Sequence, residues 1–267
     1  MLQGSVAGHR CGSDRERLGR DKLGRAPWAV LGAIALLGTL AAVVLLAGHA
    51  SADRVPHAPI YISGDGGFTP ANGVVSGSGS AADPFVIEEY TISIPFNSGV
   101  YIEDTSDYYV LRNVTVLGQR RAGSTGIYLT NSTHGLIECV VVNATETGIR
   151  VDSSSALVID NCTVSYGTAG AILVDCDSVV VRDVAATAFA YGIRLQGCDS
   201  CDVDRCTTSG NGQDGIVLER STAGQTEFCR VMGCNASSNR FGILLGTTRR
   251  CEITGCTSSW SRGGCRT

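Results

Sequence analysis

The sequence predicts an all-β protein: a right-handed, single-stranded parallel β-helix with ~22 residues per rung, preceded by one N-terminal transmembrane helix. Three observations lead to this prediction. The chain has a 22-residue repeat, apolar residues alternate with other residues inside each repeat, and turn-forming residues separate the alternating segments. A repeat of constant length in this range is typical of stacked similar units, because residues one period apart can lie above one another.

The repeat is clearest between residues 126 and 208. Four phrases of the type Gly-Ile-Arg-Leu begin 22 residues apart, at Gly126, Gly148, Gly170 and Gly192. Apolar residues within each unit stand two apart, which is the alternation of a strand with one buried face. No segment has the apolar spacing of a helix, and Ser, Thr, Asp and Gly fill the gaps as turn formers. We therefore expect three short strands and three turns in each rung.

Two other repeat folds have a similar period, and the sequence favours neither. A leucine-rich repeat needs a Leu-dense pattern and a convex helical segment, and both are missing here. A left-handed β-helix built on hexapeptides favours a period divisible by six, and 22 is not. The general preference for right-handed crossovers between parallel strands indicates the right-handed form.

Residues 1–25 are predicted to be a basic cytoplasmic segment, and residues 26–48 a transmembrane signal-anchor or a signal peptide. The stretch 26–48 has no charged side chain, and its 23 residues are enough for a bilayer, which needs ~20. The basic stretch before it favours the cytoplasmic side. Because Ala50-Ser-Ala52 is a small-x-small cleavage pattern, a retained anchor and cleavage near Ala52 both stay open. Both place the body outside the cytoplasm, at the cell membrane or as a secreted protein.

Residues 49–59 are predicted to be a linker, 60–98 an N-terminal cap of the β-helix, and 99–267 its repeats. The segment 60–98 does not fit the period, and atypical terminal units normally cover the end of a solenoid. Regular rungs then begin at Gly99, Gly126, Gly148, Gly170, Gly192, Gly215 and Gly242. Because no polar lid follows the last rung, we expect an array that is incomplete at the C-terminus, or self-association through the open rung.

The charge of the chain argues against nucleic acid as a partner. The net charge is −4, and six basic against three acidic residues give the first 52 residues +3, which leaves −7 on the remainder. A nucleic-acid groove would instead be basic.

Cysteine is abundant, with 12 residues in the chain. The pairs Cys201–Cys206, Cys229–Cys234 and Cys251–Cys256 repeat as C-x4-C, which resembles a zinc or redox spacing. The 22-residue register explains them more simply, because they continue columns occupied by valine in other rungs. We predict free buried thiols, with disulfides and a metal site as alternatives. Four His and two Met offer little for copper, so no metal or cofactor is predicted.

The outward positions of the first strand in each rung predict a carbohydrate-binding site. The residues two and four positions after the glycine point outward if those one and three positions after it point inward. This places five candidate residues on one face: Tyr101, Tyr128, Arg150, Asp152 and Arg194. Aromatic rings can stack on pyranose faces and Arg can hold acidic groups. The alternative is an ordinary solvated strand face.

Acidic residues recur in the predicted turns, for example Asp175, Asp177 and Asp199. Paired carboxylates could perform acid–base or lyase chemistry, or hold Ca²⁺. Asp is also a common turn residue, and no His or Lys stands at matched positions, so no catalytic residue is predicted. Five sequons are potential glycosylation sites: Asn113, Asn131, Asn143, Asn161 and Asn235.

The repeated Gly-Ile-x-Leu phrases, with Phe68-Thr-Pro-Ala-Asn-Gly73 and Asp83-Pro-Phe-Val-Ile87 before them, resemble the NosD-like group of right-handed β-helix repeat proteins. This group belongs to the carbohydrate-binding and sugar-hydrolysis domains, and the resemblance covers roughly residues 60–256. Its relatives include surface proteins, polysaccharide lyases, C5-epimerases and a copper-site accessory protein. The sequence has no Asp-Pro-His-Glu, Gly-His-Gly or Asn-Thr-Asp motif of the epimerases and polygalacturonases.

We therefore expect an extracytoplasmic, membrane-anchored surface protein that binds carbohydrate or has a structural role. The expected partner is a polysaccharide or a cell-envelope glycan, with the membrane contacted through residues 26–48. Two alternatives follow from the resemblance: a polysaccharide-modifying enzyme (lyase, hydrolase or epimerase) and a NosD-like accessory protein of a copper site.

Overall fold

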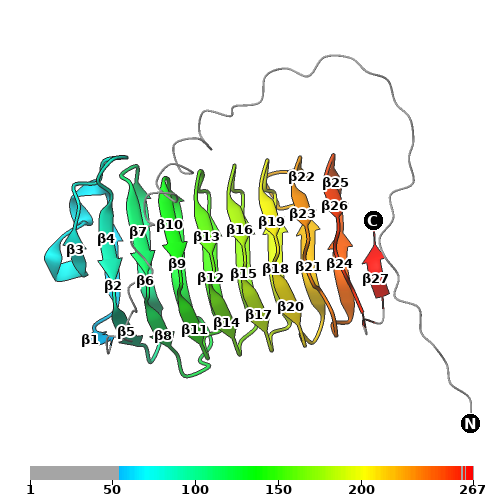
Figure 1. Cartoon of the computed structure of the whole chain (residues 1–267), viewed down its shortest axis with the longest axis horizontal. Coiled ribbons are helices and arrows are strands. Elements are labelled where there is room, and N and C mark those ends of the chain that lie inside the picture. The colour runs from blue at the N-terminus through cyan, green and yellow to red at the C-terminus, as the bar shows by residue number, and fades with distance from the viewer. Residues whose placement is uncertain (1–53, 260, 262, 267) are drawn as a thin grey trace, which may run out of the picture. The chain divides into compact units, whose positions relative to one another are not determined.

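The computed structural model describes residues 54–259, 261 and 263–266. The predicted cytoplasmic segment and the predicted membrane segment, residues 26–48, lie outside these described residues. Within them, no helix combines the length and the apolar character that crossing a bilayer would require. The strands follow one another in chain order along a common axis, from β1 at one end to β27 at the other (Figure 1).

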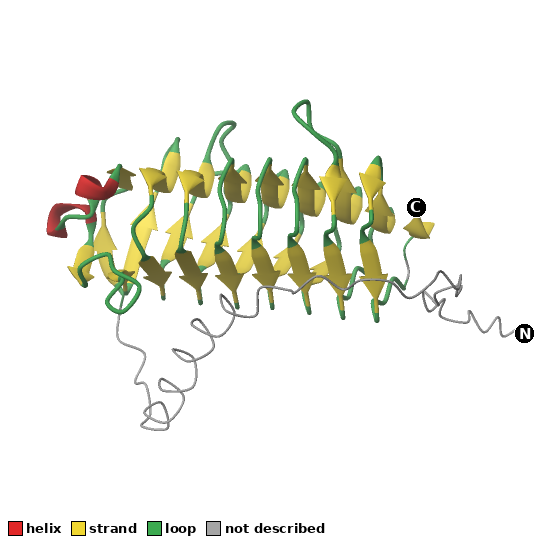
Figure 2. Cartoon of the chain, turned by 90° about the horizontal axis from the view of Figure 1, so that it is seen from above, coloured by secondary structure: helices red, strands yellow, loops and turns green. Residues whose placement is uncertain are grey.

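Three sheets, parallel except for β3, make up the solenoid (Figure 2). Each rung up to β20 adds one strand to each sheet, and the later rungs add strands to sheets I and II. Sheet I consists of β2 (Ile60–Ser63), β6 (Ser98–Thr105), β9 (Thr125–Ser132), β12 (Thr147–Asp152), β15 (Ala169–Val174), β18 (Tyr191–Gln196), β21 (Asp214–Glu219), β24 (Phe241–Leu245) and β27 (Gly263–Arg266). Sheet II consists of β3 (Val74–Ser76), β4 (Phe85–Glu88), β7 (Tyr109–Arg112), β10 (Gly135–Glu138), β13 (Val158–Asp160), β16 (Val180–Arg182), β19 (Asp202–Asp204), β23 (Arg230–Met232) and β26 (Glu252–Thr254). Sheet III consists of β1 (Val55–His57), β5 (Tyr90–Ser93), β8 (Thr115–Leu117), β11 (Val141–Asn143), β14 (Thr163–Ser165), β17 (Ala185–Thr187) and β20 (Thr207–Ser209).

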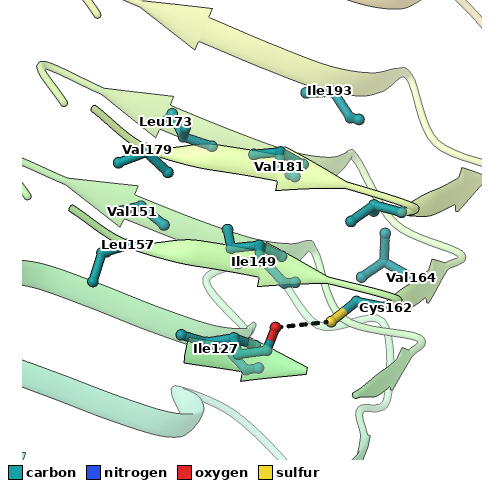
Figure 3. Close-up of a cluster of buried hydrophobic side chains, with 14 of the residues drawn as sticks. Ile127, Ile149, Val151, Leu157, Cys162, Val164, Leu173, Val179, Val181 and Ile193 are labelled. Atoms are coloured by element: carbon teal, nitrogen blue, oxygen red, sulfur yellow. Dashed lines mark hydrogen bonds between the residues drawn. The ribbon is translucent and has the colours of Figure 1, made fainter. Parts of the chain in front are cut away.

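The strand register confirms the 22-residue stack. Ile127 pairs with Ile149, and Val181 pairs with Val203, each one period further along the chain. All four side chains are fully buried. Figure 3 shows residues of successive rungs in one continuous apolar interior. The predicted fold class is therefore correct for the described part of the chain.

The N-terminal segment is a rung with a large insertion. Val55–His57 were expected in the linker, but they form β1 and pair in parallel with β5. From the expected cap, β2, β4 and β5 join sheets I, II and III in turn. The insertion after β2 carries two short 3₁₀ helices, η1 (Asp65–Gly67) and η2 (Pro70–Asn72), and β3, which pairs antiparallel with β4. This insertion hides the period in the sequence, although the apolar alternation of the rung is present.

The rung that begins at Gly215 is 27 residues long, and its extra residues lie around 222–226. They precede a small extra pair of parallel strands. These are β22 (Thr226–Glu227) and β25 (Thr248–Arg249).

Sharp corners follow the strands of sheet II, where a single residue per rung takes a left-handed backbone conformation. These residues are Glu89, Asn113, Cys139, Asn161, Asp183, Arg205, Gly233 and Gly255, with φ between 49° and 67°. Asn, Asp and Gly accept this region more readily than other residues. The corners explain why turn-forming residues recur at a constant offset.

Buried cysteines belong to the interior columns and satisfy backbone groups of neighbouring rungs. The Cys206 thiol donates to the carbonyl of Val181 (3.5 Å), and the Cys234 sulfur accepts the N–H of Cys206 (3.4 Å). Cys162 likewise donates to the carbonyl of Ile137 at 3.7 Å, the dashed line in Figure 3. The ten cysteines from Cys139 to Cys256 are free thiols in the structure.

Candidate functional site

A column of outward side chains crosses the first four rungs of sheet I. Tyr61, Tyr101, Tyr128 and Arg150 are register partners on β2, β6, β9 and β12. We call these four residues the outer column. Their strand neighbours, such as Val100 on β6, are fully buried, so the alternation of the strand turns the outer column away from the core.

The side chains of the outer column contact one another from rung to rung. The rings of Tyr61 and Tyr101 are stacked, with centroids 5.2 Å apart and an interplanar angle of 15°. The rings of Tyr101 and Tyr128 meet edge to face at 5.0 Å. The guanidinium of Arg150 lies 5.3 Å from the centroid of the Tyr128 ring. The four residues therefore form one continuous, partly aromatic surface.

Two carboxylates hold these side chains in place. Glu103 accepts hydrogen bonds from the hydroxyls of Tyr61 and Tyr101, the latter at 2.8 Å, and these bonds lower the pKa of Glu103. Asp152 accepts the hydroxyl of Tyr128 at 2.7 Å and the Nε of Arg150 at 2.8 Å. The rings and the guanidinium are thus fixed before any ligand arrives, which reduces the entropy lost on binding.

Burial raises the pKa of two phenols of the outer column, Tyr101 and Tyr128. It is the main cause of the raised pKa in both, and the carboxylates that accept their hydrogen bonds raise these values further. At neutral pH both hydroxyls are therefore donors rather than phenolates.

The outer column lines a groove of about 790 Å³ on this face. Its other side is made by residues at strand starts and turns, among them Ser98, Thr125, Glu146 and Thr147. The groove combines aromatic surface, hydroxyls and one guanidinium. Such a mixture suits a ligand with both apolar faces and polar groups.

A second, smaller hollow of about 370 Å³ lies beside the groove, and both are lined by Glu146. We call it the corner hollow; Arg120, Thr145, Tyr166 and Thr168 also line it. Neither Arg120 nor Tyr166 was singled out in the sequence, because both lie in turns outside the repeated strand positions.

Of the five predicted site residues, the structure brings four together. Tyr101, Tyr128 and Arg150 line the groove, and Asp152 holds two of them. Arg194 belongs to the same register column, but Ile172 on β15 separates it from Arg150. It forms its own cluster, in which its Nε donates to Glu219 at 2.6 Å and its guanidinium lies 5.0 Å from the Tyr191 ring centroid.

Sequence reasoning missed Tyr61. It stands in Ile60-Tyr61-Ile62, the same alternation as Val100-Tyr101-Ile102, so a signal was present. The insertion between β2 and β4 placed it outside the regular period.

The described residues contain no group of three or more His, Cys, Asp or Glu side chains arranged to hold a metal ion.

Three sequon residues, Asn113, Asn131 and Asn161, lie at corners, where their amides bond to the preceding rung. Asn131 and Asn161 are exposed, as is Asn235.

Comparison with known proteins identifies the family. The model of the family described as "Right handed beta helix region" matches residues 98–262, more than half of the chain. The chain belongs to the right-handed β-helix family. The predicted handedness is therefore correct, while membership of the NosD-like group stays a prediction.

Solved structures of other right-handed β-helix proteins resemble this one. Pectate lyase Pel9A matches with a TM-score of 0.54 and 13% identity, over 80% of this chain and 69% of the lyase. Full-length tailspike protein 2 from Escherichia coli O157:H7 bacteriophage CAB120 matches with a TM-score of 0.50 and 13% identity, over 77% and 34%. The periplasmic alginate epimerase AlgG matches with a TM-score of 0.45 and 17% identity, over 65% and 50%.

This β-helix thus spans about half the length of the epimerase. At these identities the likeness concerns the fold alone. No curated protein matches the chain.

Proposed function

We propose that this β-helix binds a polysaccharide in the groove of sheet I, across successive rungs. The observation that carries the proposal is the outer column: three tyrosines and Arg150, in contact with one another, line one wall of a groove of about 790 Å³. Parallel strands repeat every ~4.8 Å along the axis. A sugar chain in the groove would therefore contact the outer-column side chain of a new rung at about every sugar unit.

The chemistry of the groove suits carbohydrate better than nucleic acid. Aromatic rings with fixed hydroxyls present an apolar face and a polar edge to the same ligand, as sugars require. The described body is acidic in sequence, which disfavours nucleic acid. The pectate lyase among the similar structures supports the proposal, because its name says that one protein with a similar fold acts on pectate, a polysaccharide.

A second candidate function is modification of the bound polysaccharide, as a lyase, hydrolase or epimerase. Tyr128 favours it, because this residue lines the groove, its hydroxyl donates to Asp152 and its ring lies against the Arg150 guanidinium. Such a phenol can donate a proton to a leaving oxygen. Incubation with uronic-acid polymers tests this candidate: unsaturated products would indicate a lyase, and unchanged polymer after long incubation would leave binding alone.

The binding proposal is tested with the double variant Tyr128→Ala/Arg150→Ala on a glycan array. We expect the glycans bound by the wild-type chain to be lost or weakened at least about tenfold, because truncating central aromatic and Arg contacts costs ~2 kcal/mol or more. The matched control is Tyr191→Ala/Arg194→Ala, which removes the same two side chains from the same face outside the groove.

Retained binding in the control, with an unchanged melting temperature in both variants, would locate the ligand in the groove. Unchanged binding in the first variant would end the proposal. An equal loss of glycan binding in both variants would show that the binding site is not confined to the groove.

We further propose that this face works outside the cytoplasm, attached through residues 26–48 or released after cleavage near Ala52. The absence of charge in 26–48 supports it. Protease digestion of intact cells tests it, since a cytoplasmic β-helix would survive the treatment.

A further inference from the structure

The rung that begins at Gly99 is longer than the one that follows, and its extra residues form a loop between β8 and β9, residues 118–124. This loop is anchored to the next rung. The N–H groups of Gly118 and Arg120 donate to the carbonyls of Asn143 (2.8 Å) and Ala144 (2.6 Å), and the N–H of Gly123 donates to the Glu146 carboxylate. The loop is therefore a fixed wall of the corner hollow.

Arg120 reaches from this wall to an aromatic side chain two rungs further along. Its guanidinium carbon lies 4.8 Å from the centroid of the Tyr166 ring, which is 47% exposed. Stacking of this kind holds a guanidinium by its face and leaves its N–H edge free to donate. Among the residues that the structure describes, no carboxylate forms an ion pair with Arg120.

The two arginines on β12 and β18 of sheet I have carboxylate partners. In the groove, Arg150 pairs with Asp152 at 2.8 Å, and further along sheet I Arg194 pairs with Glu219. Glu146 also lines the corner hollow, but its carboxylate accepts the N–H of Gly123 and forms no ion pair with Arg120. Of the two arginines that line these hollows, Arg150 has an ion-pair partner among the described residues and Arg120 has none.

We propose that the corner hollow binds an anionic group, such as a uronate carboxylate, of the polysaccharide whose chain occupies the groove, with Arg120 as the donor. The inference rests on the proposed function, because the groove and the corner hollow share Glu146 and so form adjoining parts of one surface. A guanidinium edge and a carboxylate form two parallel hydrogen bonds, which gives charge selectivity as well as affinity. Arg120 then selects for charge, whereas the outer column holds the sugar rings.

The test compares acidic and methyl-esterified forms of oligogalacturonate and oligomannuronate by titration calorimetry. The wild-type chain should bind the acidic form more tightly than the ester. Arg120→Ala should weaken binding of the acidic form about tenfold and leave ester binding within twofold, which removes the preference. Arg120→Lys should restore part of it, because the charge returns without the bidentate edge.

Arg121→Ala is the matched control. It removes the same charge from the adjacent position of the same loop, and Arg121 does not line the corner hollow. Equal weakening by Arg121→Ala would indicate unspecific charge attraction and overturn the inference. Tyr166→Phe should bind like the wild type, and Tyr166→Ala like Arg120→Ala.

Two results separate the inference from the proposed function. If the wild-type chain binds acid and ester equally, the role of Arg120 is wrong and the groove proposal stands. If it binds neither form of either oligomer, both are overturned for uronate polymers.

Discussion

At the scale of single residues, strand alternation decides whether a side chain serves the core or the surface. Tyr101 on β6 points outward and lines the groove. Tyr109 on β7 is 1% exposed, and its hydroxyl makes a 2.7 Å hydrogen bond to the buried Ser132 hydroxyl. Burial raises the pKa of both phenols, but only the first is placed to meet a ligand.

Asp214, at the start of β21, is a buried acid without full compensation. Its side chain is 8% exposed, and one carboxylate oxygen has no hydrogen-bond partner among the described residues. Burial raises its pKa above the ordinary 3.8, and the charge of Glu219 adds to this. The charges of Arg240 and Arg194 act in the opposite direction.

The raised pKa predicts a pH-dependent cost in stability. A carboxyl whose pKa is higher in the folded state stabilises the fold below its unfolded pKa, and this contribution is lost as pH rises through the folded pKa. Asp214→Asn removes the charge, so we expect the variant to be more stable than the wild type by about 1 kcal/mol at pH 7.

The difference should shrink toward pH 3 in urea denaturation curves. Exposed Asp177→Asn is the control and should change little at either pH. A destabilised Asp214→Asn at pH 7 would contradict the assignment.

At the scale of the rung, close contact between neighbouring backbones sets the sequence pattern. A Cβ on Gly148 would lie 2.5 Å from the carbonyl oxygen of Gly170 and 3.0 Å from Val164. The glycine at the second position of the strands from β6 to β21 in sheet I is therefore required by packing.

This predicts opposite outcomes for two glycine substitutions. Gly148→Ala should destabilise the protein by about 3 kcal/mol, because a backbone atom cannot move aside as a flexible side chain could. Gly212→Ala should be nearly neutral, since its nearest contact would be 3.7 Å away, at the carbonyl oxygen of Phe189. Denaturant midpoints measure both, and a tolerated Gly148→Ala would contradict the proposed packing.

The buried side-chain amides of Asn211 and Asn239 also bond the backbone of neighbouring rungs, which the sequence did not predict. The Oδ1 of Asn211 accepts the N–H of Phe189, and the Oδ1 of Asn239 accepts the N–H of Asn211, both at 3.0 Å. Their Nδ2 groups donate to the carbonyls of Ala186 and Thr208. These side chains satisfy backbone groups inside a corner, as the cysteine thiols do elsewhere.

At the scale of the whole molecule, the stack excludes water from a continuous interior that contains most of the described cysteines. Cys176, Cys198, Cys201 and Cys206 are at most 2% exposed. Cys162 stands at the same position of the repeat as Cys206. Burial raises the pKa of the Cys162 thiol to about 12, so its reactive thiolate is scarce at ordinary pH.

We therefore expect a sharp division in thiol reactivity. In the native protein at pH 8, iodoacetamide should modify the partly exposed Cys139 and Cys251 first, and spare Cys176, Cys198, Cys201 and Cys206 until denaturant is added. Peptide mass spectrometry distinguishes the positions. Rapid native modification of Cys201, or too few thiols after denaturation without reductant, would refute the buried free-thiol interior.

Much of the fold follows from the 22-residue period. Because one rung repeats the next, the spacing of Gly126 and Gly148 and the alternation around Ile127 are enough to predict the strands, their register and the cysteine columns. The same alternation places Tyr101, Tyr128 and Arg150 on one outward face. These are local properties, since each depends on a short segment and its neighbour one period away.

Three features of the site became visible only in the folded chain. Tyr61 joins the outer column across an insertion, Arg120 reaches Tyr166 from a loop, and Arg194 is separated from the groove. The period did not reveal the contacts of Tyr61 and Arg120, because insertions and turns interrupt it. The repeating strands follow a pattern set by backbone geometry, whereas side-chain contacts between corners depend on the path that each loop takes in space.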